Sequence, residues 1–156
     1  MGNSISKDTV VDGFDTQKYL GKWYEVARYP FFFEKDCSNV TAEYQLMDDD
    51  MIKVINKCHD KDYVAVGRAT QPEEGIGRLK VSFFPGIWGD YNILRLLEGP
   101  DKYEISVVAD KMSGGDYEHL WILSRTPPSQ LDRNQKMFLN KAIGDLNINL
   151  DKLIIH

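Results

Sequence analysis

Apolar and polar residues alternate along most of this chain, with the period of two that is typical of β-strands with one buried face. In residues 22–29, for example, Trp23, Glu25, Ala27 and Tyr29 share one face. Turn-forming residues separate eight such segments, which are residues 22–29, 39–47, 51–58, 63–70, 78–84, 90–97, 102–109 and 118–125. Eight strands joined by hairpins predict an all-β fold, an eight-stranded antiparallel up-and-down β-barrel.

The pattern changes after the eighth segment, where two prolines end the sheet and a helical period follows. We expect Ser129 to cap a helix that runs to about residue 143 and ends at Gly144. The predicted apolar stripe of this helix consists of Leu131, Met137 or Phe138, and Ala142. The helix should pack outside the barrel, and residues 150–155 should add a short final strand.

The inward-facing side chains of the predicted strands are mostly apolar or aromatic, with a few hydroxyl, amide and imidazole groups. Such a lining is typical of a cavity for an amphipathic ligand, and small residues on several strands favour a cavity over a barrel packed solid. The predicted ligand-binding residues are Ala27, Tyr29, Ala42, Tyr44, Val54, Asn56, Gly67, Ala69, Val81, Phe83, Tyr91, Ile93, Ser106, Val108, His119 and Trp121.

One end of the barrel should be closed by residues at the start of the first strand and the end of the last. Arg125 ends its strand where Trp23 begins another, so a guanidinium on the indole face would give a contact of about 0.5–2 kcal/mol. Gly21 lets the chain enter the strand through a conformation that a Cβ would resist. Asp15 is expected to cap a short helical turn over residues 16–20 at the same end.

Strand parity also places charged and titratable groups inside the barrel. Arg95 and Glu104 should face each other as a buried pair, unless the register is shifted by one and both point outward. His119 lies at the mouth, where we expect a packed or solvated histidine, because no motif of a catalytic triad accompanies it. The three acidic residues at 48–50 are interpreted as a solvated turn, and no metal or cofactor is assigned.

Length and charge limit the classes of function. The chain of 156 residues corresponds to one domain, predicted over residues 13–156, after a flexible leader over residues 1–12. No run approaches the roughly 18 apolar residues of a membrane-spanning helix. The net charge of −5 argues against a nucleic-acid partner.

The first residues match the pattern for N-myristoylation, with Gly2 as the acceptor after removal of Met1. The alternatives are a polar leader or the trimmed start of a secreted protein. The leader therefore predicts a cytoplasmic or membrane-associated protein, with secretion as the alternative. The glycosylation sequon that begins at Asn39 has meaning only in the secreted case.

Five short segments of this sequence resemble motifs of the lipocalin family, and they occur in the family's order and at its spacing. They are Gly-Lys-Trp-Tyr-Glu-Val-Ala-Arg at 21–28, Val-Ile-Asn-Lys at 54–57, Leu-Lys-Val-Ser-Phe-Phe at 79–84, Gly-Asp-Tyr-Asn at 89–92 and Leu-Trp-Ile-Leu-Ser-Arg-Thr-Pro at 120–127. The resemblance is to the branch of bacterial outer-membrane lipocalins, plant temperature-induced lipocalins and apolipoprotein D. One departure is residues 99–103, where the Thr of the family's Thr-Asp-Tyr motif is missing.

The resemblance implies a monomeric or weakly dimeric carrier of fatty acids, lysophospholipids or other small hydrophobic molecules. Selectivity should then come from the mouth loops at residues 31–35 and 85–89. An alternative is an enzyme that acts on a bound lipid through Cys58, because one family member uses an inward cysteine as its nucleophile. Cys58 is otherwise an inert buried thiol or half of a disulfide with Cys37, which requires the intervening loop to curl back. A third possibility is an interaction module whose aromatic mouth loops contact a membrane or a second copy.

Overall fold

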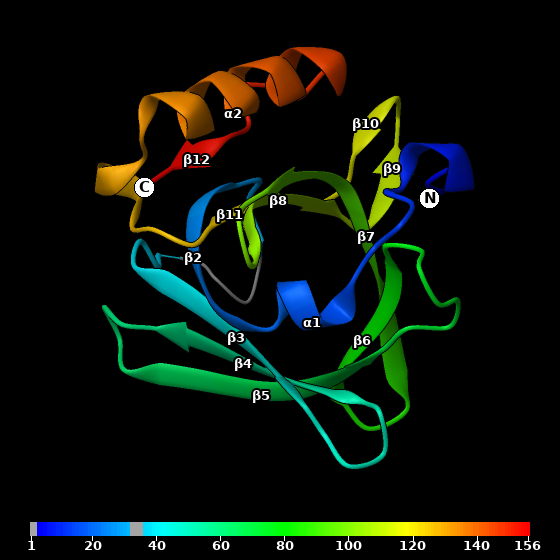
Figure 1. Ribbon diagram of the computed structural model, residues 1–156. Helices are drawn as coiled ribbons and strands as arrows, with labels where there is room; N and C mark the ends of the chain where they lie inside the picture. The colour runs from blue at the N-terminus through cyan, green and yellow to red at the C-terminus, as the bar shows by residue number, and fades with distance from the viewer. Residues whose placement is uncertain (1–2, 32–35) are drawn as a thin grey trace.

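Eight strands close into an antiparallel barrel (Figure 1), as the alternating pattern predicts. This computed structural model describes residues 3–31 and 36–156. Each barrel strand pairs with the next along the chain, and β11 pairs with both β8 and β2, which closes the barrel. The barrel strands are β2 (Gly21–Arg28), β3 (Val40–Leu46), β4 (Ile52–Cys58), β5 (Tyr63–Thr70), β6 (Arg78–Phe84), β7 (Ile87–Glu98), β8 (Tyr103–Ala109) and β11 (Leu120–Ser124). The predicted fold class is confirmed.

The remaining elements lie around this barrel. Helix α2 (Arg133–Asp145) crosses its outside beside β12 (Ile154–Ile155), the short final strand, which pairs with β2 (Figure 1). A small sheet joins β1 (Asn3–Ser4), β9 (Lys111–Ser113) and β10 (Asp116–Tyr117). Short helical turns are η1 (Lys7–Thr9), α1 (Thr16–Tyr19) and η3 (Pro128–Gln130). Among the described residues, no helix is long and apolar enough to cross a membrane.

Helix α2 begins later than predicted. Its cap is Asp132, whose carboxylate accepts from the Gln135 N–H while the Gln135 side chain accepts from the Asp132 N–H. This reciprocal capping box is stronger than the single hydroxyl of Ser129, which lies in the preceding turn η3. The helix also continues through Gly144 to Asp145. Met137 is exposed, and Leu139 and Ala142 supply the buried stripe.

The segment expected to be a flexible leader packs on the barrel over its described part. Ile5 and Val10 are buried in the outer apolar layer, the cluster that also contains Leu139 and Ala142 of α2. Strand β1 pairs with β9, and the N–H of Val11 donates to the carbonyl of Ile93. Ile5, Val10 and Val11 are few and not periodically spaced among polar residues, so the sequence could not indicate this docking. Gly2, the predicted acylation site, lies outside the described residues.

Register shifts between paired strands change which side chains enter the barrel, and the bulges at Val26 and Leu94 affect predicted inward positions. In the pairing of β2 with β11, Ile122 lies opposite Ala27 but Leu123 lies opposite Glu25, so Val26 is an extra residue. Strand parity therefore reverses after Glu25. Ala27 and Tyr29, predicted to face the ligand, instead pack in the outer apolar layer, where the Tyr29 hydroxyl donates to Asp116 and accepts from the Asn149 N–H.

The second bulge corrects the predicted pair of Arg95 and Glu104. Ile93 lies opposite Val108 but Arg95 lies opposite Val107, a residue of the outer layer, so Leu94 is the extra residue. Glu104 accepts a hydrogen bond from the Gln135 side chain of α2. In the part of the chain that the structure describes, these two residues form no ion pair.

Candidate functional site

One end of the barrel is closed by Trp23 and Arg125. Trp23 is fully buried, and its indole N–H donates to the Tyr19 carbonyl over 2.9 Å. The Arg125 guanidinium carbon lies 3.9 Å from the indole centroid. Its nitrogens donate to the carbonyls of Tyr103, Lys22 and Lys18. Gly21 has φ +101°, and a Cβ there would approach the Arg125 guanidinium to 3.2 Å, so glycine fits where other residues would be strained.

Tyr19 completes this closed end from helix α1. The helix is capped by Asp15 as predicted, since the Asp15 carboxylate accepts from the Gln17 N–H. The Tyr19 hydroxyl lies 2.8 Å from that of Ser106 and 2.6 Å from that of Tyr91. Tyr91 in turn lies 2.8 Å from the Tyr44 hydroxyl. We call Tyr19, Tyr44, Tyr91 and Ser106 the hydroxyl cluster.

Above this floor is a cavity of about 470 Å³ that opens at the other end of the barrel. This volume lies within the range of small-molecule sites, about 300–1,000 Å³. The cavity wall is mostly apolar and includes Ala42, Val54, Val81 and Leu123. Lysine and aspartate side chains lie at its rim, among them Lys57, Asp110 and Lys111. The arrangement can enclose a long apolar molecule and leave a polar end at the mouth.

The structure brings half of the predicted ligand-binding residues to the wall of this cavity. These residues are Ala42, Tyr44, Val54, Asn56, Val81, Phe83, Tyr91 and Trp121. Their contact with a ligand stays a prediction.

The other predicted positions do not line the cavity. Ala69, Ile93 and Val108 lie in the packed inner core below it, and Ser106 is fully buried beside Tyr19. Gly67 adds no volume, because a Cβ at Gly67 would lie 2.6 Å from the ring of Phe83, which fills the space above it. The prediction took the whole inner face as a cavity, whereas aromatic side chains fill its lower half.

His119 lies at the rim, as a packed histidine. Its Nδ1 lies 2.6 Å from an Asp110 carboxylate oxygen, and its ring stacks on Trp121 with centroids 6.0 Å apart. Phe31, the first residue of the predicted mouth loop at residues 31–35, contacts both rings edge-on. The rest of that loop, residues 32–35, lies outside the described residues.

A buried charged group at the cavity wall is not among the predicted ligand-binding residues. Glu25 lines the cavity, and one of its carboxylate oxygens lies 2.8 Å from Arg28 Nη1 and 2.6 Å from His156 Nε2. The three side chains are at most 4% exposed. Arg28 also donates to the Cys37 carbonyl. Strand parity places the Glu25 side chain inside the barrel. The bulge at Val26 turns Arg28 to the same side, and the alternating pattern does not indicate this.

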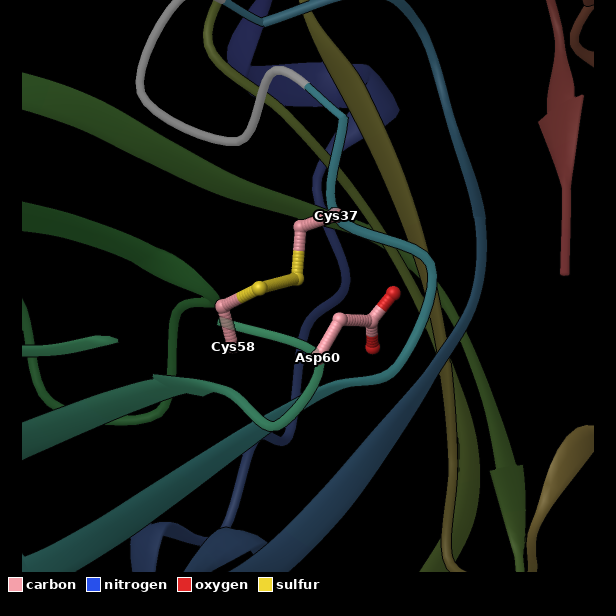
Figure 2. Close-up of side chains that lie close together, drawn as sticks. All are labelled: Cys37, Cys58 and Asp60. Carbon is pink, nitrogen blue, oxygen red and sulfur yellow. A yellow bond between two sulfur atoms is a disulfide. The ribbon is translucent and has the colours of Figure 1, made fainter. Parts of the chain in front are cut away.

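Cys37 and Cys58 form a disulfide at the mouth (Figure 2). Both residues line the cavity, so the bond ties the segment before β3 to the end of β4. Asp60 lies beside the bond, and hydrogen bonds from the Ser38 side chain and N–H lower the pKa of its carboxyl. Because thiolates are the form that binds soft metals and attacks substrates, this bonded pair is assigned neither role.

The hydroxyl cluster predicts a loss of stability in alkali. Burial raises the pKa of Tyr19 from 10.0 to about 12 and that of Tyr91 well above 10.0. Between pH 10 and about 12 the unfolded chain therefore releases protons that the folded protein keeps, and the free energy of unfolding falls as pH rises. For Tyr19 the loss should be roughly 2 kcal/mol.

Urea unfolding at a series of pH values measures this dependence, and phenolate absorbance of the folded protein follows the tyrosines directly. Tyr19→Phe should show a shallower fall than the parent. Full ionisation of all tyrosines near pH 10 in the folded state would contradict the assignment.

Comparison with known proteins identifies the family. The lipocalin-like domain matches residues 14–156. Outer membrane lipoprotein Blc of Citrobacter freundii is 40% identical over 134 residues, which cover 83% of this chain and 72% of that protein. Apolipoprotein D of Bos taurus is 31% identical over 162 residues, which cover 94% of this chain and 78% of that protein. The solved structure of insecticyanin from the tobacco hornworm Manduca sexta superposes with a TM-score of 0.73 at 20% identity, covering 99% of this chain and 86% of that one. With this match along most of its length and its closed eight-stranded barrel, the chain belongs to the lipocalin family.

Proposed function

We propose that this protein binds and carries a small hydrophobic ligand, a fatty acid, a lysophospholipid or a similar lipid, inside the barrel. The observation that supports this most is the apolar cavity of about 470 Å³, closed below and open at a polar rim. Each methylene moved from water into such a cavity contributes about 0.8 kcal/mol, so an acyl chain binds without special chemistry. Membership of the lipocalin family supports the same role.

The proposal is tested by titrating the purified, delipidated protein with palmitic acid and with a lysophosphatidylethanolamine. We expect one molecule per chain, observed by native mass spectrometry. The heat capacity change of binding, measured by calorimetry, should be negative because apolar surface is buried. Each probe should displace the other, since both would occupy the same cavity. Failure of both probes to bind would reject the carrier function.

The enzymatic alternative through Cys58 has less support. A cysteine nucleophile attacks as the thiolate, and the Cys58 sulfur is bonded to that of Cys37. The curated relatives outer membrane lipoprotein Blc and apolipoprotein D also carry no enzyme name. We therefore favour binding and transport over turnover.

We further propose that the protein works at a membrane and outside the reducing cytosol. Disulfides persist mainly in oxidising compartments, and the Cys37–Cys58 bond supports such a location. Several relatives are named outer membrane lipoproteins, which supports membrane association. Acylation of Gly2 stays a prediction.

Apolar side chains at the mouth supply a means of contact with a lipid surface. Phe84, Ile87 and Trp88 line the cavity rim and are also exposed, Ile87 by 66%. Replacing Ile87 with serine should weaken cosedimentation with phospholipid vesicles by roughly tenfold, because burial of one such side chain contributes about 1.5–3 kcal/mol. Leu150→Ser, at an equally exposed apolar residue away from the cavity, is the control. Equal vesicle binding by both variants would exclude contact through the mouth.

A further inference from the structure

The floor of the cavity is chemically unlike its wall. Tyr44 from β3 and Tyr91 from β7 line the cavity, while Tyr19 from α1 and Ser106 from β8 lie behind them. Their hydroxyls form a continuous chain, Tyr44 to Tyr91 to Tyr19 to Ser106, with oxygen separations of 2.8, 2.6 and 2.8 Å. The rest of the cavity wall includes apolar side chains such as Val54, Val81 and Leu123. A ligand that fills the cavity therefore contacts apolar side chains and the side chains of Tyr44 and Tyr91, two members of the hydroxyl cluster.

The chain of hydroxyls has hydrogen-bonding capacity beyond its own links. Each hydroxyl has one hydrogen to donate and two acceptor positions. The three links use three acceptor positions among the four hydroxyl oxygens. Acceptor positions therefore remain on the cluster even when one of its hydroxyls makes another contact. Each link can also run in either direction, because either oxygen can be the donor. By rotating its hydroxyls, the chain can meet a ligand group that donates or one that accepts.

The floor suits a neutral group and not a charged one. Burial raises the pKa values of Tyr19 and Tyr91, so both phenols stay protonated at physiological pH. An ionised carboxylate at this depth would lose its hydration in exchange for few hydrogen bonds, which is unfavourable. Charged side chains such as Lys57, Asp110 and Lys111 lie instead at the rim. The floor of the cavity thus favours a neutral end of a ligand, and the rim favours a charged end.

We propose that the hydroxyl cluster is a ligand subsite that hydrogen-bonds a neutral oxygen group, a hydroxyl or a carbonyl, on the end of the ligand that enters the barrel first. This inference rests on the proposed lipid-binding function and narrows it to chains that carry oxygen at both ends. The preferred ligand class is then oxygenated lipids, such as ω-hydroxy or oxo fatty acids, over simple fatty acids of the same length.

The test compares palmitic acid with ω-hydroxypalmitic acid, which differ only in the terminal hydroxyl. Dissociation constants for both are measured by calorimetry on the parent protein, on Tyr91→Phe and on Tyr44→Phe. Tyr63→Phe is the matched control, because Tyr63 lines the mouth and is half exposed. The readout is the ratio of the two constants within one variant, so a partly unfolded fraction affects both ligands equally.

We expect the parent to bind the hydroxylated acid at least as tightly as palmitic acid. In Tyr91→Phe and Tyr44→Phe the ratio should move against the hydroxylated acid by roughly 3- to 10-fold, the effect of one lost hydrogen bond. Tyr63→Phe should keep the parental ratio. If the ratio is the same in the parent and in both floor variants, the subsite is wrong, although binding of palmitic acid would leave the carrier function intact. If neither acid binds the parent, both proposals fail.

Discussion

Replacing Trp23 with alanine is expected to lower the free energy of unfolding by about 3–5 kcal/mol, the usual cost of removing a large buried aromatic side chain. Trp23 is fully buried, it packs against Tyr19 with ring centroids 5.0 Å apart, and its indole N–H is bonded. Its loss would also leave the Arg125 guanidinium above a void instead of an indole face. Urea unfolding followed by circular dichroism gives the difference directly.

Trp88→Ala provides the control for this measurement, because Trp88 is exposed at the mouth. It removes the same side chain but should cost less than about 1 kcal/mol, as is usual for an exposed position. Similar losses in both variants would contradict the view that the closed end holds the barrel together. Such a result would indicate that the mouth contributes as much stability as the floor.

Replacing Val54 with tryptophan is expected to weaken palmitic acid binding by at least tenfold. Val54 is buried on β4, between Tyr44 and Gly67 on the neighbouring strands, and it lines the cavity. An indole there would occupy space that the acyl chain needs. Exclusion of only two methylenes costs about 1.6 kcal/mol, which corresponds to more than a factor of ten in affinity.

The control places the same side chain outside the cavity. Val64→Trp changes a half-exposed residue of β5 that does not line the cavity, and it should leave affinity near the parental value. Since overpacking can itself cost 1–3 kcal/mol, thermal unfolding of both variants establishes that each is folded at the assay temperature. Unchanged affinity in folded Val54→Trp would show that the lipid binds elsewhere.

Much of the fold could be predicted from the sequence, because strands with one buried face carry an alternating pattern. The pattern identified every barrel strand, and Asp15 correctly indicated the cap of α1. What it could not reveal were the bulges at Val26 and Leu94. An inserted residue is itself apolar and fits either face, so only the pairing with a neighbouring strand shows that parity has reversed.

The candidate site was predicted less completely, for a different reason. Parity along strands indicates which side chains point inward but not how far the interior is already filled. Tyr19 enters the barrel from helix α1, before the first barrel strand, and packs with Phe14 and Trp23. These rings fill the lower half of the interior, where several predicted ligand-binding residues lie. Likewise, one partner of Glu25 is His156, and no local pattern encodes a contact between residues 131 positions apart.

Cys37 is fixed at the rim in two ways, by its sulfur to Cys58 and by its carbonyl to Arg28. A segment that must become ordered when a guest arrives reduces affinity through lost conformational entropy. This part of the entrance is preorganised by a covalent bond and a buried ion pair, so little of that entropy remains to be lost there. Most of the conformational entropy lost on binding then comes from the ligand's own flexible chain. Ligands with rigid chains lose less of it and are therefore favoured.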